Sequence, residues 1–405
     1  MLDVFVGRQP IYNRQLEVFA YELLFRSGVN NHAIFDDGDQ ATSQVILNTF
    51  MEIGLENIVG EKMAFINLTR TFILGSYLFP FPQTRIGLEI LEGIRVDADI
   101  VESVRKLSEQ GYLIVLDDFV YHENLLPLVE MADIIKLDIL ALGRDGVREH
   151  LEILKKYKIE ILAEKVETQD DFEFCKRLGF NYFQGYFFCQ PNVIKGQRIP
   201  VNRLATLQLL AKLQDPDTEM QELEALISQD VSMSYKLLRC VNSSVYGLPT
   251  RVESIHQAVM LLGQPGLKAW ASLITLSSID DKPHELFQTA LIRAKMCELL
   301  AGARQDSDKE SYFTVGLFSV LDALMDVPMP ELLNTLPVSA DIKQALLHHQ
   351  GALGIILQCV LAYERGDWDN VNCLGLTHEQ ITHAYLDAVA WSNQAGKELL
   401  ATTLH

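Results

Sequence analysis

Polar side chains close almost every short apolar run in the first half of this sequence. The runs are MAFIN, GLEILE, LIVLDD, IIKLD, ILAE and NYFQ. Their polar residues are Asn67, Glu89, Glu92, Asp117, Asp118, Lys136, Asp138, Glu164 and Gln184. Runs of this length predict strands, and in a (β/α) barrel the carboxyl ends of the strands open at one common face. We therefore expect residues far apart in the sequence to meet in one site.

Most of these side chains offer oxygen atoms. Together with an acid from an earlier run they form a set of oxygen donors without a clustered histidine: Glu22, Asn67, Glu89, Asp117 and Asp118. Such donors are typical of Mg²⁺ or Mn²⁺ sites. A pair of these ions relieves repulsion between carboxylates and activates a water for attack on a phosphodiester, while Lys136 stabilises charge on the phosphate. Any single acid at a strand end can instead cap the next helix or pair with a lysine.

The elements that must position these residues alternate between two patterns. From about residue 60 to 190, apolar runs of strand length alternate with amphipathic stretches such as DADIVESVRKLSEQG, which carry helical periodicity and end in glycine. This pattern predicts an α/β fold with a parallel sheet, open or closed. The preceding segment VFVGRQPIYNRQLEVFAYELLFR predicts two strands joined by a polar turn, and hence an antiparallel pair at the start.

The second half follows a different pattern. After NVIKGQRIP the strand-like runs stop, and Leu- and Ala-rich helical patterns continue, interrupted by breakers such as GLP, QPG and PMP. This predicts a compact all-α bundle of short helices. The sequence thus predicts two independently folding domains, residues 1–198 and 199–405, joined by a polar linker at 192–200.

Composition and charge exclude several classes of protein. The 405 residues carry a formal net charge of −20, which argues against binding a nucleic acid polymer through its phosphates. The N-terminus lacks a signal peptide pattern and no uninterrupted apolar run approaches about 18 residues, so we expect a cytoplasmic protein without a membrane segment. The six cysteines are scattered without a C-x-x-C pair, which favours neither a zinc site nor disulfides.

Seven short motifs occur in order along the first half. They are ELLFR at Glu22–Arg26, FIN ending at Asn67, EILE at Glu89 and Glu92, DDF at Asp117–Phe119, KLD at Lys136–Asp138, AEKVET at Ala163–Thr168, and QGY at Gln184–Tyr186. By these motifs, residues 1 to about 195 resemble the EAL domain, the fold of cyclic di-GMP phosphodiesterases. The resemblance implies a TIM-like (β/α) barrel with an antiparallel first strand.

The resemblance also implies a role for each matching residue. Glu22, Asn67, Glu89, Asp117 and Asp118 would hold Mg²⁺ or Mn²⁺; Lys136 and Glu164 would position and activate the attacking water; Arg26, Asp138 and Gln184 would bind the nucleotide; Glu92 would support the loop that follows Asp117-Asp118. The substrate implied is cyclic di-GMP and the product is linear pGpG.

This sequence departs from the EAL pattern next to those residues. Active members usually continue the aspartate pair as DDFGTGYSS, whereas this chain reads DDFVYHENLL. Val120 takes a positive φ only at a cost, so we expect a changed loop path. Lys165 replaces the glycine beside Glu164, and its ammonium can pair with a metal-binding carboxylate and compete with the cation. These departures predict weakened binding and little or no hydrolysis.

The second half resembles the HDOD domain over about residues 199–390. The matching stretch is LISQDVSMSYKLLRCVNSSVYGLPTRVESIHQAVMLLG. The related HD phosphohydrolases use a His-Asp dipeptide, and the chain contains none; an adjacent pair such as His348-His349 points to opposite sides of a helix. We therefore expect a regulatory module that binds a protein partner or a second copy of the chain.

Three functions fit the sequence. The first is a degenerate EAL barrel that binds cyclic di-GMP or a protein with little turnover, coupled to the HDOD module. The second is an active Mg²⁺- or Mn²⁺-dependent phosphodiesterase, which retention of the ligand set favours. The third is a scaffold that acts through its helical half. The altered loop and Lys165 place the first slightly ahead.

Overall fold

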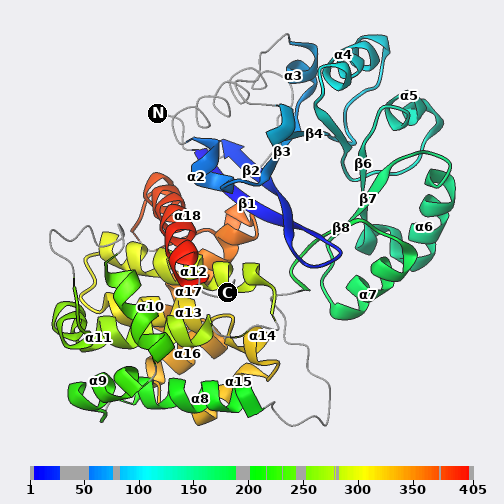
Figure 1. Ribbon diagram of the computed structural model, residues 1–405. Coiled ribbons are helices and arrows are strands. Elements are labelled where there is room, and N and C mark those ends of the chain that lie inside the picture. Colours follow the sequence, from blue (N-terminus) through cyan, green and yellow to red (C-terminus); the bar gives the residue numbers. More distant parts are fainter. Residues whose placement is uncertain are drawn as a thin grey trace. The chain divides into compact units, whose positions relative to one another are not determined.

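The computed structural model describes residues 4–27, 54–75, 83–187, 201–242 without 216 and 230, and 252–400 without 278, 280, 281 and 374. The chain divides into two compact units, Met1–Phe188 and Cys189–His405. The predicted linker at 192–200 lies outside the described residues, so its role stays a prediction. Each unit is described by itself below (Figure 1).

Eight strands close the first unit into a barrel. They are β1 (Val4–Asn13), β2 (Val18–Ser27), β3 (Met63–Leu68), β4 (Ile86–Ile90), β5 (Leu113–Leu116), β6 (Ile134–Asp138), β7 (Glu160–Glu164) and β8 (Tyr182–Gln184). Strand β1 runs antiparallel to both of its neighbours, β2 and β8, and all other neighbouring strands are parallel. The predicted α/β barrel with an antiparallel first strand is confirmed.

Helices cover the outside of the barrel (Figure 1). They are α2 (Leu55–Val59), α3 (Arg70–Leu74), α4 (Ala98–Glu109), α5 (Leu126–Val129), α6 (Ile139–Leu154) and α7 (Gln169–Leu178), with short 3-10 turns η1 (Gln83–Arg85) and η2 (Glu123–Leu125). Four of these helices begin at a capping residue whose side-chain oxygen accepts hydrogen bonds from backbone N–H groups. These capping residues are Thr69, Asp97, Asp138 and Thr168. These caps fix the turns that follow the strands.

An apolar layer fills the barrel interior. Ile11, Ala20, Phe65, Val115, Ile134 and Leu162 form one buried cluster, with Tyr182 packed against it. Gly87 leaves room for the Phe65 ring, because a Cβ at Gly87 would lie 2.6 Å from that ring. The layer therefore fills the inside of the barrel. It forms a floor beneath the side chains that lie two positions further along the parallel strands.

The second unit is all-helical, as predicted. Its helices are α8 (Val201–Gln214), α9 (Met220–Gln229), α10 (Val231–Val241), α11 (Ile255–Leu276), α12 (His284–Ala303), α13 (Lys309–Phe318), α14 (Leu321–Met325), α15 (Met329–Thr335), α16 (Ala340–His348), α17 (Gly351–Glu364) and α18 (His378–Leu400), with η4 (Trp368–Asn370). Helix α12 packs against α13, α17 and α18 and is buried on nearly all sides. It is the centre of the bundle.

One helical stretch within the described residues, Ala340–Glu364, is long and apolar enough to cross a membrane by length and composition alone. It consists of α16 and α17, which are separated by His349 at a left-handed φ of 53°. Helix α17 packs against α12, α13 and α16. Its apolar residues are therefore explained by burial in the bundle.

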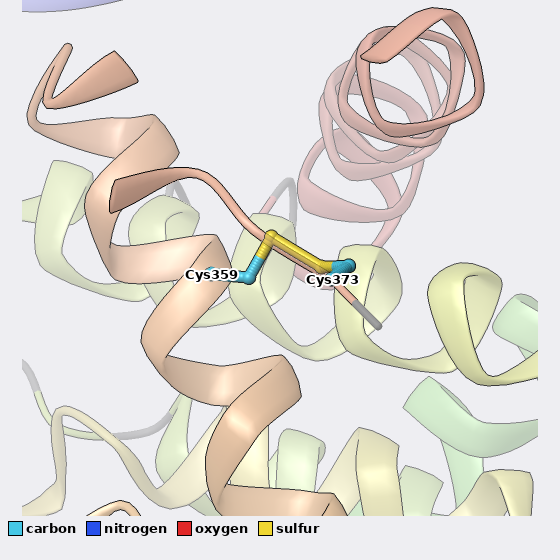
Figure 2. Close-up of a disulfide and its surroundings, with 2 residues drawn as sticks. All are labelled: Cys359 and Cys373. Carbon is cyan, nitrogen blue, oxygen red and sulfur yellow. A yellow bond between two sulfur atoms is a disulfide. The ribbon is translucent and has the colours of Figure 1, made fainter. Parts of the chain in front are cut away.

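A disulfide joins Cys359 of α17 to Cys373, with a Cα–Cα distance of 5.9 Å (Figure 2). The sequence reading that favoured no disulfide was wrong here. After α17 the chain folds back through η4, and this return brings together two buried cysteines 14 residues apart in the sequence. Spacing alone does not reveal such a return. Cys175 and Cys297, in contrast, are free and buried.

Reduction of this disulfide is expected to lower the free energy of unfolding of the helical unit. The loop-closure entropy of a loop of this length is worth about 3 kcal/mol. Denaturant unfolding with and without a thiol reductant measures the effect. A Cys359→Ser/Cys373→Ser variant is the control, because reductant should not change its stability. Alkylation of both cysteines in the unreduced, denatured protein would contradict the pairing.

Candidate active site

One polar layer lies directly above the apolar floor of the barrel. Side chains two residues apart on a strand lie on the same face. Each strand therefore places a polar residue two positions away from its residue in the apolar floor. The layer consists of Gln9, Glu22, Asn67, Glu89, Asp117, Lys136, Glu164 and Gln184. Convergence at the carboxyl ends of the parallel strands was predicted, and Gln9 is an addition from antiparallel β1.

The ammonium of Lys136 lies at the centre of this layer and is fully buried. Its Nζ is 3.0 Å from Glu22 Oε2, 3.0 Å from Glu89 Oε1, 2.8 Å from Asp117 Oδ1 and 2.8 Å from Glu164 Oε1. Four carboxyl groups thus surround one positive charge. The local excess of negative charge must be relieved by protons or by a further cation.

Burial and crowding shift the pKa of each acid in the layer. Burial, reinforced by the charge of Glu22, raises the pKa of Glu89 well above its usual value. Burial also raises the pKa of Asp117, and it raises the pKa of Glu164 to about 8 despite the attraction of Lys136. For Lys136, burial is outweighed by the surrounding carboxylates, and its pKa rises well above the usual lysine value. Lys136 therefore stays an ammonium, while Glu164 can exchange a proton near neutral pH.

Glu22 differs from the other acids because amide groups also bind it. Its Oε2 accepts a hydrogen bond from Gln184 Nε2 at 2.8 Å, and its Oε1 accepts one from Asn67 Nδ2 at 3.2 Å. Burial opposes ionisation of Glu22, but Lys136 and these bonds outweigh it and lower its pKa. Gln184 Nε2 also donates to Gln9 Oε1 at 3.0 Å, which links β1 to the site. Glu22 is thus held ionised in a fixed position.

A second cluster forms around Lys165, beside the first. Lys165 Nζ donates a hydrogen bond to Asp138 Oδ2 and lies 4.0 Å from Asp118 Oδ1. Asp138 also accepts the N–H groups of Leu140 and Ala141 at the start of α6. The sequence analysis expected Lys165 to pair with a metal-binding carboxylate, but its hydrogen-bonded partner is Asp138, which was assigned to the nucleotide, and Asp118 of the metal set lies at 4.0 Å. Asp138 combines this ion pair with a helix cap.

The loop after the aspartate pair takes its left-handed turn at Asp118, whose φ is 41°. Aspartate tolerates this region better than a β-branched residue does. Val120 is not among the left-handed residues and is 48% exposed. Lys165, which stands where the EAL motif has glycine, also adopts a left-handed φ, of 54°. The backbone there keeps a conformation that favours glycine.

The two remaining predicted site residues are Arg26 in β2 and Glu92 just after β4. The Arg26 backbone pairs with Phe5 in the hairpin of β1 and β2, and its side chain lies outside the described residues. Glu92 lines a cavity of about 290 Å³ between the segment after β4 and the segment after β5. Asp117, Asp118 and His122 line the same cavity, so Glu92 faces the loop that it was predicted to support.

Several oxygen atoms in the polar layer are left without a hydrogen bond. In the described part of the chain, Asn67 Oδ1, Glu89 Oε2 and Glu164 Oε2 are buried and accept no hydrogen bond. Unbonded buried oxygens of this kind are the donors that Mg²⁺ and Mn²⁺ prefer. Within the described ranges no three or more histidine, cysteine or acidic side chains are grouped to hold a metal ion. Lys136 provides the positive charge at the centre of this arrangement.

Comparison with known proteins identifies both halves of the chain. Family models match an EAL domain at residues 76–191 and an HDOD domain at residues 199–352. The cyclic di-GMP phosphodiesterase CdgJ of Vibrio cholerae serotype O1 is 36% identical, covering 98% of this chain and 94% of that protein. The chain belongs to the EAL–HDOD family. The uncharacterized protein YuxH of Bacillus subtilis is 35% identical, covering 96% of this chain and 98% of YuxH.

A solved EAL structure is similar to part of the chain. It is a standalone EAL protein from Vibrio cholerae O395 in a c-di-GMP-bound form, 24% identical, with a TM-score of 0.36. The match covers 46% of this chain and 90% of that protein.

Gly185 of the EAL domain, directly after Gln184, is expected not to tolerate a side chain. Its φ is +150°, and an added Cβ would lie 2.1 Å from the carbonyl oxygen of Val166. Gly185→Ala should lower the free energy of unfolding by about 3 kcal/mol or more. Gly111→Ala is the matched control, because its φ is +91° and nothing lies within 4 Å; it should cost about 1 kcal/mol. Equal costs in denaturant unfolding would show that the contact with Val166 is unimportant.

Proposed function

We propose that this chain is a cyclic di-GMP signalling protein whose EAL barrel binds the nucleotide with little or no hydrolysis and is coupled to a regulatory HDOD module. Membership of the EAL–HDOD family supports the signalling role. The fold supports it as well, because seven of the motif residues converge in one polar layer.

The polar layer supports binding of a cation and a phosphodiester together. We assign the cation, Mg²⁺ or Mn²⁺, to Glu22, Asn67, Glu89, Asp117 and Asp118. We assign the nucleotide to Arg26, Asp138 and Gln184. The cation would supply charge neutralisation and an activated water. The buried oxygens of Asn67 and Glu89 that accept no hydrogen bond support this assignment.

Lys136 and Glu164 have distinct roles in the proposed site. Lys136 remains an ammonium, so it can stabilise negative charge on a bound phosphate but cannot accept a proton. Glu164, whose pKa is raised to about 8 by burial, can accept a proton from an attacking water as general base. The ion pair of 2.8 Å between the two side chains keeps the carboxylate oriented. The parts needed for slow chemistry are therefore present.

The observation that carries the low-turnover proposal is the pairing of Lys165. Its ammonium is bonded to Asp138 and lies 4.0 Å from Asp118, so it engages two acids that the site needs. A bound cation would have to compete with this positive charge at Asp118. In-line attack also needs placement within fractions of an ångström, and a shift of about 1 Å can cost a hundredfold in rate. Binding should therefore survive better than turnover.

An active phosphodiesterase is the second candidate. The relative that is named a cyclic di-GMP phosphodiesterase is 36% identical along nearly the whole chain, which favours this candidate. Calorimetric titration of the purified protein with cyclic di-GMP in the presence of Mn²⁺ tests the feature that both candidates share. Glu22→Ala should abolish the heat of binding, because Glu22 connects Lys136, Asn67 and Gln184. Absence of binding by the unmodified protein would remove both candidates and leave the scaffold function.

We propose that the HDOD half binds a protein partner or a second copy of the chain. Its surface includes exposed apolar side chains on α10 and α11, with Tyr235 52%, Met260 74% and Leu261 47% exposed. The net charge of −20 argues against a nucleic acid polymer as the partner. Sedimentation of the full chain and of Met260→Lys tests self-association; a monomer at all concentrations would leave only a different protein as partner.

A further inference from the structure

The loop that follows the aspartate pair is attached to α6 by a histidine. The backbone N–H of Tyr121 donates a hydrogen bond to His150 Nε2 at 3.3 Å. The other ring nitrogen, Nδ1, lies 2.8 Å from the carbonyl oxygen of Gly146, one turn earlier on α6. A carbonyl only accepts, so Nδ1 carries the proton and Nε2 is the acceptor. The neutral Nδ1–H tautomer satisfies both contacts at once.

Aromatic packing adds a second contact between the same elements. The His150 ring meets the Phe119 ring edge to face, with 6.4 Å between centroids. Phe119 also packs on Tyr121 and is buried. Its backbone N–H donates to the carbonyl of Lys136 at 3.1 Å. His150 therefore contacts the chain on both sides of Val120, directly after Asp117 and Asp118.

Helix α6 is a suitable anchor for this loop. It starts at Ile139, immediately after β6, the strand that carries Lys136. Asp138 fixes its first turn, and a kink at Gly143 separates that turn from the part that carries His150. The strand with the central lysine and the helix that holds the aspartate loop are thus consecutive in the chain. The position of Lys136 and the position of the helix that holds the loop are therefore linked.

We propose that His150 is a positioning residue that, as the neutral Nδ1–H tautomer, holds the loop after Asp117 and Asp118 in place of the missing Gly- and Ser-rich segment. This inference rests on the proposed function, since it assigns His150 an effect on cation and nucleotide affinity. His150 would hold the loop through two contacts. One ring nitrogen accepts a hydrogen bond from a loop N–H, and the ring packs edge to face against a loop aromatic side chain.

Two substitutions separate the hydrogen bond from the packing. His150→Phe keeps a ring against Phe119 but removes the acceptor, and His150→Gln keeps an acceptor oxygen near the place of Nε2. Amide hydrogen exchange of residues 119–125 in the free protein reports directly on the loop. We expect His150→Phe to speed exchange in this segment at least about tenfold at unchanged thermal unfolding, with exchange restored toward the unmodified rate in His150→Gln.

Affinity is the second readout. Calorimetry with Mn²⁺ and with cyclic di-GMP should show about tenfold weaker binding for His150→Phe and partial recovery for His150→Gln. Unchanged loop exchange in His150→Phe would overturn the inference, and so would faster exchange with unchanged affinities, which would make His150 merely structural. If the unmodified protein binds neither probe, the proposed function fails, whereas the exchange experiment still decides whether His150 holds the loop.

Discussion

Lys136→Met is expected to lower the free energy of unfolding of the barrel by about 3 to 5 kcal/mol at pH 8. The substitution keeps much of the side-chain volume but removes the ammonium that pairs with four buried carboxyl groups. Removing one partner of a buried ion cluster leaves the others unpaired, and this costs more than losing a surface contact. Denaturant unfolding of the two proteins measures the difference.

The loss should shrink as the pH falls. Burial already raises the pKa of Glu89 and Glu164, the latter to about 8, and without the ammonium their pKa values rise further. The folded variant then binds more protons than the unfolded chain, so its stability falls as the pH rises from about 4.5 through the folded pKa values. Near pH 5 we expect less than half of the destabilisation found at pH 8.

An exposed lysine provides the control for this pH series. Lys106 is 64% exposed on α4, and its ion pair with Glu102 is a surface contact. Lys106→Met should change the free energy of unfolding by less than about 1 kcal/mol, with little dependence on pH. If Lys136→Met were as mild as Lys106→Met, or if its cost grew toward acid pH, Lys136 would not be the centre of the charged layer.

Lys165→Gly is expected to raise the rate of cyclic di-GMP hydrolysis at least about tenfold. It removes the ammonium that is bonded to Asp138 and lies close to Asp118, and it places glycine at a left-handed φ of 54°. The backbone change should also stabilise the barrel by about 1 kcal/mol. Linear pGpG is measured by chromatography over a series of Mn²⁺ concentrations that starts below saturation. Restoring GTGYSS after Phe119 as well should raise the rate further.

Lys165→Gln separates the charge of Lys165 from its backbone conformation. It removes the positive charge but keeps a non-glycine residue at the left-handed position. If the ammonium limits the reaction, Lys165→Gln should recover most of the gain in rate but none of the gain in stability. A folded Lys165→Gly protein with unchanged rate and unchanged Mn²⁺ affinity would show that Lys165 does not limit the site.

The strand-end pattern predicted most of the polar layer because a polar residue stands near the carboxyl end of one strand after another. Asn67, Lys136 and Glu164 each follow an interior apolar residue by two positions, so their convergence followed from strand geometry. Gln9 was missed because β1 runs antiparallel and its polar residue does not close an apolar run. The signal that could have identified Gln9 is its place in the hairpin, because the antiparallel register pairs it with Glu22.

Other features depend on tertiary contacts that a local pattern does not contain. Asp138 has the predicted strand-end position and its helix cap is local, but its bond to Lys165 forms only when β6 and β7 lie side by side. The pairing of Cys359 with Cys373 required the return of the chain after α17. The QPG breaker, in contrast, is a local signal, and the interruption that it predicted is confirmed: Gly263, directly before it, takes a non-helical φ of 66° and ψ of 176° and separates two helical segments within α11.

The central claim is that the barrel binds cyclic di-GMP but turns it over slowly, and the most direct test is product formation by the unmodified protein. Purified protein is incubated with cyclic di-GMP and Mn²⁺, and linear pGpG is followed by chromatography beside Glu22→Ala. We predict saturable binding of the nucleotide, with product formation within a few-fold of that variant. Rapid production of pGpG that Glu22→Ala abolishes would contradict the claim and make this chain a working phosphodiesterase.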